Sequence, residues 1–215
     1  GEIAAMAIGA CLGDIANQVI GDSFLTKAAM IGTQYTDSFA TVQPTSPLFK
    51  LSRATGLRVY DWSNLLQVNM LGERFANETD SSTNWNGAAL ASVLTVDPSD
   101  GELHRYGGPL WTIFDSKAVE REGWVIDDTT VDREDGRFFE ADTLEELAEK
   151  VVNKYYEQIK MDPEALVATV KRYNELVDKG TDEDFGKEGM TDKIETGPFY
   201  AAWSTPGFHD CTTGL

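Results

Sequence analysis

Gly72-Glu73-Arg74-Phe75-Ala76-Asn77-Glu78 is the stretch of sequence that decides the fold of this chain. It follows the segment from Leu65 to Met70, which predicts a strand. Leu71-Gly72-Glu73-Arg74 predicts a hairpin-like turn that leads into a second strand. Asn77-Glu78-Thr79 also matches a glycosylation sequon, although a pattern this short often arises by chance.

A long helix is predicted downstream of this stretch, beginning at Asp162. Aspartate is a good N-cap, and Pro163 suits the first helical position because its missing N–H would have no partner there. Gly180 is well placed to end the helix. One apolar stripe runs along the helix and is formed by residues three or four positions apart: Leu166, Val170, Tyr173 and Val177.

Shorter elements precede and follow this helix. Thr143 and Glu146 have the spacing of a capping box, which predicts a helix that continues to about Val152. The remaining predicted elements are a strand over 109–115 that ends at an acid, a short helix over 117–122 and a strand over 197–203. Helices and strands mix without regular alternation, which favours the α+β class, with a small mixed or antiparallel sheet packed by helices.

The composition is that of a globular domain with a strongly acidic charge. The 215 residues include 18 basic and 36 acidic ones, so the net charge is -18. This balance argues against nucleic acid as a partner, because phosphates need a positive surface. No apolar run approaches the roughly 20 residues of a membrane-spanning helix. Cys11 and Cys211 are either free thiols or a pair, and without a Cys-x-x-Cys or a histidine cluster no metal site is predicted.

The motif over 72–78 and three downstream segments together resemble the substrate-capping domain of the flavoproteins related to fumarate reductase and succinate dehydrogenase. The downstream segments are residues 142–147, 162–166 and 169–175. The resemblance covers nearly the whole chain. It implies that residues 1–215 form a single capping domain, inserted between the two halves of an FAD-binding domain in a larger enzyme.

Both ends of the chain agree with this interpretation. Residues 1–7 resemble the helix that leaves the first half of the FAD-binding domain, and residues 206–215 resemble the segment that returns to the second half. The sequence contains no G-x-G-x-x-G loop, which a dinucleotide needs for its pyrophosphate. FAD is therefore expected in the parent protein but not on the isolated chain, whose expected partners are the FAD-binding domain and a small-molecule substrate.

Three positions depart from the pattern of fumarate reductases. Ser82 stands where the resemblance places a proton-donating arginine, four positions after the motif. Gln43, in the segment that ends at Thr45, replaces a histidine, and Arg58 lies where a Thr-Glu pair is expected. These residues are predicted to bind a substrate other than fumarate or succinate, such as a larger or less charged enone, steroid-like or aromatic compound.

The return segment supplies the predicted catalytic residue. His209 is expected to bond the substrate or transfer a proton, or else to be a structural histidine. Thr212 and Thr213 are expected either to donate hydrogen bonds to a substrate carbonyl or to cap a turn. Arg58 is either a contact for an anionic substrate or a surface residue.

Other conspicuous side chains have structural interpretations. Arg74 and Glu78 are expected to form an internal ion pair that holds the hairpin against the FAD-binding domain, and His104 is expected in a solvated loop. Tyr60 and Trp62 are expected near the substrate pocket. The other large aromatic side chains are predicted to be core residues: Trp85, Trp111, Tyr173, Phe199, Tyr200 and Trp203.

Two functions follow from these observations. The first is the capping domain of an FAD-dependent oxidoreductase that transfers a hydride between flavin and a carbon–carbon double bond. The second is a stand-alone binding or interaction module without redox activity, which the replaced positions Gln43, Arg58 and Ser82 favour.

Overall fold

A computed structural model describes the central and C-terminal parts of the chain. The described residues are 57, 59–80, 88–89, 91–92, 95–96, 103–104, 107–128, 131, 133, 136–152 and 160–204. The predicted elements before residue 57 and the return segment after residue 204 lie outside this part.

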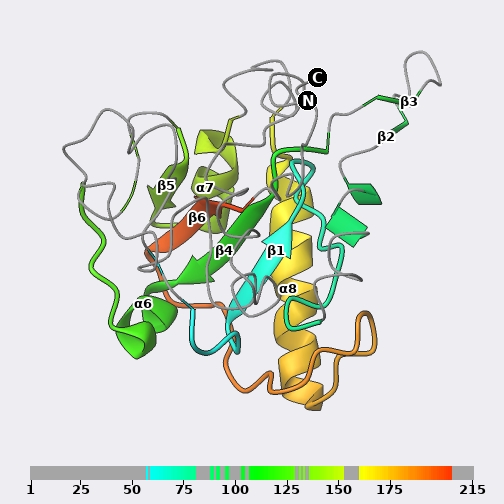
Figure 1. The fold of residues 1–215 in the computed structure, drawn as a ribbon, viewed down its shortest axis with the longest axis vertical. Coiled ribbons are helices and arrows are strands. Elements are labelled where there is room, and N and C mark those ends of the chain that lie inside the picture. The colour runs from blue at the N-terminus through cyan, green and yellow to red at the C-terminus, as the bar shows by residue number, and fades with distance from the viewer. Residues whose placement is uncertain are drawn as a thin grey trace, which may run out of the picture.

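A four-stranded antiparallel sheet forms the centre of the fold (Figure 1). Its strands are β1 (Leu65–Val68), β4 (Trp111–Asp115), β5 (Phe138–Ala141) and β6 (Phe199–Trp203). Their spatial order is β1-β4-β6-β5, so the last strand in the sequence lies inside the sheet. The α+β prediction with an antiparallel sheet is confirmed.

A separate two-stranded pair lies outside this sheet. It consists of β2 (Thr95–Val96) and β3 (Leu103–His104), which run antiparallel. The expectation that His104 lies in a loop is wrong, because His104 pairs with Thr95 in this ladder.

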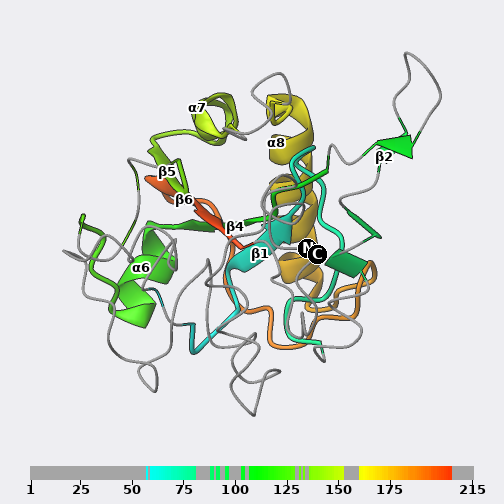
Figure 2. The same cartoon turned by 45° about the horizontal axis from the view of Figure 1, so that its top comes forward.

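Among the described residues, three helices cover the two faces of the four-stranded sheet. Helices α7 (Leu144–Lys150) and α8 (Pro163–Lys179) lie on one face, and α6 (Ser116–Glu122) lies on the other (Figures 1 and 2). Both α7 and α8 were predicted, with ends within about two residues of those observed. Within the described ranges, no helix combines the length and the apolarity that crossing a membrane requires.

Caps fix the helix ends as the sequence predicts. The Asp162 side chain accepts from the backbone N–H of Glu164, and the Thr143 hydroxyl accepts from that of Glu146. Each bond satisfies a donor that the first helical turn leaves free. Gly180 ends α8 in the left-handed conformation, with φ of 70°.

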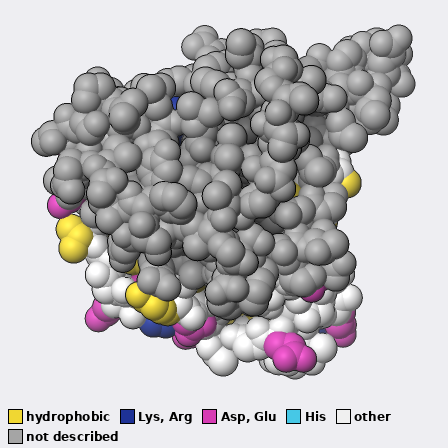
Figure 3. All heavy atoms as spheres, viewed as in Figure 1, with side chains coloured by type: hydrophobic (Ala, Val, Ile, Leu, Met, Phe, Trp, Pro, Cys, Tyr) yellow, Lys and Arg dark blue, Asp and Glu magenta, His cyan; other side chains and the backbone are white. Residues whose placement is uncertain are grey.

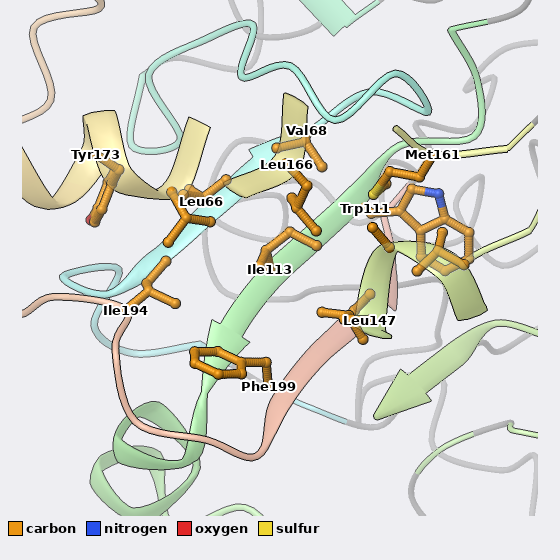
Figure 4. Close-up of a cluster of buried hydrophobic side chains, with 14 of the residues drawn as sticks. Leu66, Val68, Trp111, Ile113, Leu147, Met161, Leu166, Tyr173, Ile194 and Phe199 are labelled. Atoms are coloured by element: carbon orange, nitrogen blue, oxygen red, sulfur yellow. The ribbon is translucent and has the colours of Figure 1, made fainter. Parts of the chain in front are cut away.

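Alternating side chains of the sheet build two hydrophobic cores. On β4, Trp111 and Ile113 face the core under α7 and α8, whereas Phe114 faces the core on the α6 side. Figure 4 shows the first core, in which side chains of β1, β4 and β6 meet those of α7 and α8. Trp111 packs edge-to-face on Trp203, with ring centroids 5.5 Å apart, a favourable geometry for two aromatic rings.

The aromatic side chains that were predicted to be core residues are buried wherever the structure describes them. The five buried ones are Trp111, Tyr173, Phe199, Tyr200 and Trp203. Trp85 lies outside the described residues. Trp62 was expected near a pocket, but it is buried in the core on the α6 side.

Two strand predictions need correction. The turn at Gly72 does not lead into a second strand, because only the single bridge between Val68 and Arg74 forms and β1 pairs with β4 instead. Residues 138–141 form β5, which the sequence did not predict because the run lies directly before the α7 cap. Their partner is β6, which lies about 60 positions away in sequence.

Gly72 brings the motif against the start of α8. Its φ is +81°, a conformation that glycine adopts without steric cost. A Cβ atom at this position would lie 2.9 Å from the backbone nitrogen of Leu166. The close contact explains why a glycine begins the motif.

Candidate functional site

The motif residues Arg74 and Glu78 form a buried ion pair. Arg74 Nε lies 2.9 Å from Glu78 Oε1, and Arg74 Nη2 lies 2.9 Å from Glu78 Oε2. The two side chains are 6% and 0% exposed, respectively. Glu78 Oε1 also accepts from the backbone N–H of Gln67 in β1, at 3.1 Å. The predicted internal ion pair is therefore present, and it fastens the motif to the central sheet.

Asp182 binds the same arginine from the loop that follows α8. Arg74 Nη2 lies 2.8 Å from Asp182 Oδ2. The Asp182 carboxylate also accepts from the backbone N–H groups of Asp184, Phe185 and Lys187, at 3.0 to 3.1 Å. One carboxylate thus shapes the loop and joins it to the motif.

Lys187 completes the cluster beneath β1. Its Nζ donates to the backbone oxygen of Leu65 at 2.7 Å and to the Tyr173 hydroxyl at 3.1 Å, and it lies 3.3 Å from Glu78 Oε2. The Tyr173 hydroxyl in turn donates to the backbone oxygen of Ser63. The Lys187 side chain is 1% exposed.

Two opposing effects set the pKa values of the cluster: burial favours the neutral form of each group, and ion pairing favours the charged form. Burial favours the neutral form of Glu78, but Lys187 and Arg74 hold its pKa below the usual value. Burial opposes ionisation of Asp182 in the same way, and the bond from Arg74 keeps its pKa low. Burial prevails at Lys187 and lowers its pKa to about 8. Burial, reinforced by the charge of Glu78, raises the pKa of Tyr173.

The cluster is a structural element, because its charges pair with one another and lie under the surface. Two cations, Arg74 and Lys187, balance two carboxylates, Glu78 and Asp182. The four residues and Tyr173 connect β1, the motif, α8 and the loop after α8. The four charged side chains are at most 6% exposed, and the partners that the described residues give to Arg74 and Glu78 all belong to this chain.

The sequon residues also serve a local turn. Asn77 Oδ1 accepts from both the backbone N–H and the hydroxyl of Thr79, at 2.8 and 2.7 Å. Asn77 Nδ2 donates to the backbone oxygen of Gly186 at 3.2 Å. The Asn77 and Thr79 side chains therefore stabilise the turn at the end of the motif, which accounts for both polar residues without glycosylation.

A second polar cluster holds the segment before β1 against α6. The Glu122 carboxylate accepts from the backbone N–H groups of Tyr60 and Asp61, at 2.7 and 2.8 Å. Arg121 Nη2 donates to the backbone oxygen of Asp61 at 2.7 Å, and Nη1 donates to the side chain of Asn64. Figures 1 and 2 both show the chain running beside α6 before it enters β1.

Asp115 connects this segment to the end of β4. Its buried carboxylate caps α6 by accepting from the backbone N–H of Ala118, and it accepts from the Asn64 side chain at 2.8 Å. It also accepts from the backbone N–H groups of Glu195 and Thr196, both at 3.0 Å. The acid that the sequence places at the end of this strand therefore organises three neighbouring segments.

The segment from 57 to 64 presents side chains to two sides. Leu57, Val59 and Trp62 are buried in the core on the α6 side. Tyr60 is 74% exposed, and the Asp61 side chain is 50% exposed. Tyr60 is one of few exposed large hydrophobic residues among those described, and Figure 3 shows hydrophobic side chains next to acidic and basic ones along the lower edge of the molecule.

The predicted substrate-binding and catalytic residues lie outside the described part of the chain. These are Gln43, Thr45, Arg58, Ser82, His209, Thr212 and Thr213. The structure therefore places Arg74 and Glu78 alone among the predicted site residues. Among the described residues, no group of three or more histidine, cysteine, aspartate or glutamate side chains could hold a metal ion.

The chain is similar to parts of longer known proteins. No protein-family model matches the chain. The chain is 33% identical to the NADH:acrylate oxidoreductase of Vibrio harveyi over 154 residues, which are 71% of this chain and 13% of that protein. It is also 33% identical to the 4-oxocyclohexanecarboxylate 2-dehydrogenase of Sinomonas cyclohexanicum, over 63% of this chain and 24% of that protein. The chain thus spans less than a quarter of the length of either relative.

A solved structure has a similar fold. It is the open conformation of a flavocytochrome c3 fumarate reductase, with a TM-score of 0.52 and 22% sequence identity. The match covers 97% of this chain and 28% of the fumarate reductase chain.

Proposed function

Because the chain belongs to the family of flavoproteins related to fumarate reductase, we propose that it is the substrate-capping domain of a larger FAD-dependent oxidoreductase. The observation that carries this proposal is the pattern of coverage: nearly all of the chain matches a small part of a fumarate reductase. Such a pattern is expected for one domain of a multidomain enzyme.

The chain would not hold FAD by itself. Its sequence lacks the glycine-rich loop that binds a dinucleotide, and Arg74 and Lys187, the two cations of the buried cluster, are paired with carboxylates of this chain. The FAD-binding domain of the same protein would hold the cofactor, which supplies or accepts a hydride at a carbon–carbon double bond. The capping domain would contribute substrate contacts and exclude water from the reacting atoms.

The predicted residues have distinct tasks in this scheme. His209 would transfer the proton that accompanies the hydride, and Thr212 and Thr213 would donate hydrogen bonds to a carbonyl of the substrate. Arg58 would bind an anionic group. Gln43, Thr45 and Ser82 would line the site, with Gln43 and Ser82 in place of a histidine and an arginine of fumarate reductases.

The names of the relatives support an activated double bond as the reacting group. Acrylate is an alkene conjugated to a carboxylate, and 4-oxocyclohexanecarboxylate carries a ketone at C4, with which a double bond between C2 and C3 would be conjugated. Since Gln43 and Ser82 replace a histidine and an arginine, we propose an enone or unsaturated acid other than fumarate as the substrate.

The test uses the full-length product of the gene that encodes this chain. Flavin content is measured by absorbance, and reduction of 2-cyclohexen-1-one, acrylate and fumarate is followed with reduced methyl viologen as electron donor. We expect bound FAD, reduction of at least one of the first two compounds and little reduction of fumarate. His209→Ala should abolish turnover with FAD retained, whereas His104→Ala, a histidine outside the return segment, should not.

Three results would contradict parts of the proposal. A protein without FAD would support the stand-alone binding module, which the replaced positions also favour. A preference for fumarate would overturn the proposed substrate class. Unchanged turnover in His209→Ala would move the proton donor to another residue.

A further inference from the structure

A cavity of about 290 Å³ lies between the motif, α8 and the loop after α8. Figure 1 shows this loop, in orange, running beside the C-terminal half of α8. The buried side chains of Tyr173 and Leu176 line the cavity from α8, and Phe185 lines it from the loop. Glu73 and Arg74 line it from the motif. The volume is that of a site for a small molecule.

Arg74 brings a donor without a partner to this cavity. Its Nε and Nη2 atoms bind Glu78 and Asp182, whereas the buried Nη1 has no hydrogen-bond partner among the described residues. The whole side chain is only 6% exposed. A buried donor without an acceptor costs free energy, and nearly all such groups in proteins have a partner. An oxygen atom of a bound molecule would satisfy Nη1.

Phe185 covers the guanidinium group on the side of the loop. Arg74 Cζ lies 5.0 Å from the centroid of the Phe185 ring and 5.4 Å from that of Tyr173 on α8. Tyr173 belongs to the hydrophobic core, but Phe185 is 39% exposed. Rotation of the Phe185 ring would therefore open Nη1 to the cavity and leave the core undisturbed.

Glu73 adds a negatively charged acceptor to the same cavity. Its backbone N–H and oxygen both bind Asn69, but no described residue pairs with its exposed carboxylate. Arg172 also lines the cavity, but Asp184 already binds it through two hydrogen bonds. The cavity thus combines a donor at Arg74 with an acceptor at Glu73.

We propose that this cavity binds a small molecule that carries a primary carboxamide on an apolar body. The amide oxygen would accept from Arg74 Nη1, and an amide N–H would donate to the Glu73 carboxylate. A trans peptide group directs its N–H and C=O to opposite sides, so it fits two neighbouring residues less well. The apolar body would pack against Leu176 and Phe185.

Three probes of similar shape test this chemistry on the full-length protein. Benzamide has both the donor and the acceptor, acetophenone has the acceptor alone, and benzoate is an anion that Glu73 would repel. Dissociation constants are measured by ligand-observed NMR. We expect benzamide to bind several-fold more tightly than either of the other two, because only benzamide satisfies both side chains.

Two substitutions assign the binding to this cavity. Ala168 is exposed on α8 and lines the cavity, so Ala168→Phe would fill the space and should abolish the preference for benzamide. Glu73→Ala should weaken benzamide about tenfold and acetophenone less than about twofold. Glu188→Ala is the matched control, since Glu188 is an exposed acid that does not line the cavity, and it should change no dissociation constant.

Circular dichroism of each variant confirms that it is folded before its binding is compared. Equal dissociation constants for the three probes in wild type would overturn the proposal. So would unchanged benzamide binding in both Ala168→Phe and Glu73→Ala. Absence of benzamide binding at millimolar concentration would show that Nη1 is satisfied by water alone, and it would also overturn the proposal.

Discussion

Arg74 bonds to Asp182 across 108 positions of sequence, with 2.8 Å between Nη2 and Oδ2. The contact joins the motif at the end of β1 to the loop after α8. Because the same guanidinium also binds Glu78, one side chain neutralises two buried carboxylates together with Lys187. The stability of the domain should therefore depend on this arginine far more than on its surface ion pairs.

Replacing Arg74 with methionine should destabilise the domain by about 3–5 kcal/mol, because Glu78 and Asp182 would stay buried with too little positive charge. Urea unfolding followed by circular dichroism measures the loss. Arg133→Met is the control, since Arg133 pairs with Glu140 at the surface, and it should cost about 1 kcal/mol or less. Equal losses of unfolding free energy in the two variants would show that the buried cluster stabilises the domain no more than a surface ion pair does.

Lys187 should give the domain a distinctive dependence on alkaline pH. Its pKa is about 8 in the folded protein and near 10.5 in the unfolded chain. Between these values the unfolded chain binds more protons, so the contribution of Lys187 to the free energy of unfolding rises with pH. Below pH 8 both states are protonated and this contribution is constant.

The comparison of wild type with Lys187→Met isolates that contribution. Unfolding free energies are measured from pH 7 to 10.5 for both proteins. Between pH 8 and 10.5, the free energy of unfolding of wild type should increase relative to that of the variant. A constant difference across this range would mean that Lys187 keeps an ordinary pKa in the folded protein.

Gly72→Ala should disturb the contact between the motif and α8. The added Cβ would meet the Leu166 nitrogen at 2.9 Å, and the residue would also need a positive φ. Gly189→Ala is the control. It would also need a positive φ, of +72°, but nothing lies within 4 Å of its added Cβ. The control should cost about 1–2 kcal/mol, and Gly72→Ala should cost clearly more. Similar melting temperatures for the two variants would contradict the close contact.

Asp115→Ala should be more harmful than the loss of an ordinary helix cap. It would leave the N–H groups of Ala118, Glu195 and Thr196 and the Asn64 amide without their acceptor. We expect a loss of at least about 3 kcal/mol. Asp162→Ala removes a solvent-exposed cap of α8 and should cost about 1 kcal/mol. Thermal unfolding of both variants distinguishes these outcomes, and equal costs would contradict the role of Asp115.

The sequence predicted the features that depend on neighbouring residues. Asp162, Pro163 and Gly180 predicted both ends of α8, and the spacing of Leu166, Val170 and Tyr173 predicted its buried face. The strand ending at Asp115 was predicted for the same reason, since an apolar run stops at a polar residue. Such signals are local, so they are visible in a single sequence.

Features that depend on distant residues were not predicted. The segment around Asp182 and Lys187 reads as a charged loop, and nothing local marks these two side chains as buried partners of Arg74 and Glu78. The pairing of β1 with β4 rather than with a hairpin partner was missed for the same reason. Pairing across 40 or more positions is decided by the whole core and not by the turn that follows β1.

The interior place of β6 sets the order in which the domain can assemble. During synthesis, β1, β4 and β5 all emerge before residues 199–203, yet β6 must lie between β4 and β5. Until then, β4 and β5 each have an edge without its final partner, and open strand edges can recruit other chains. A ribosome-bound chain whose residues 199–203 are still inside the exit tunnel should therefore need protection from aggregation, whereas release of these residues from the tunnel would let the sheet close.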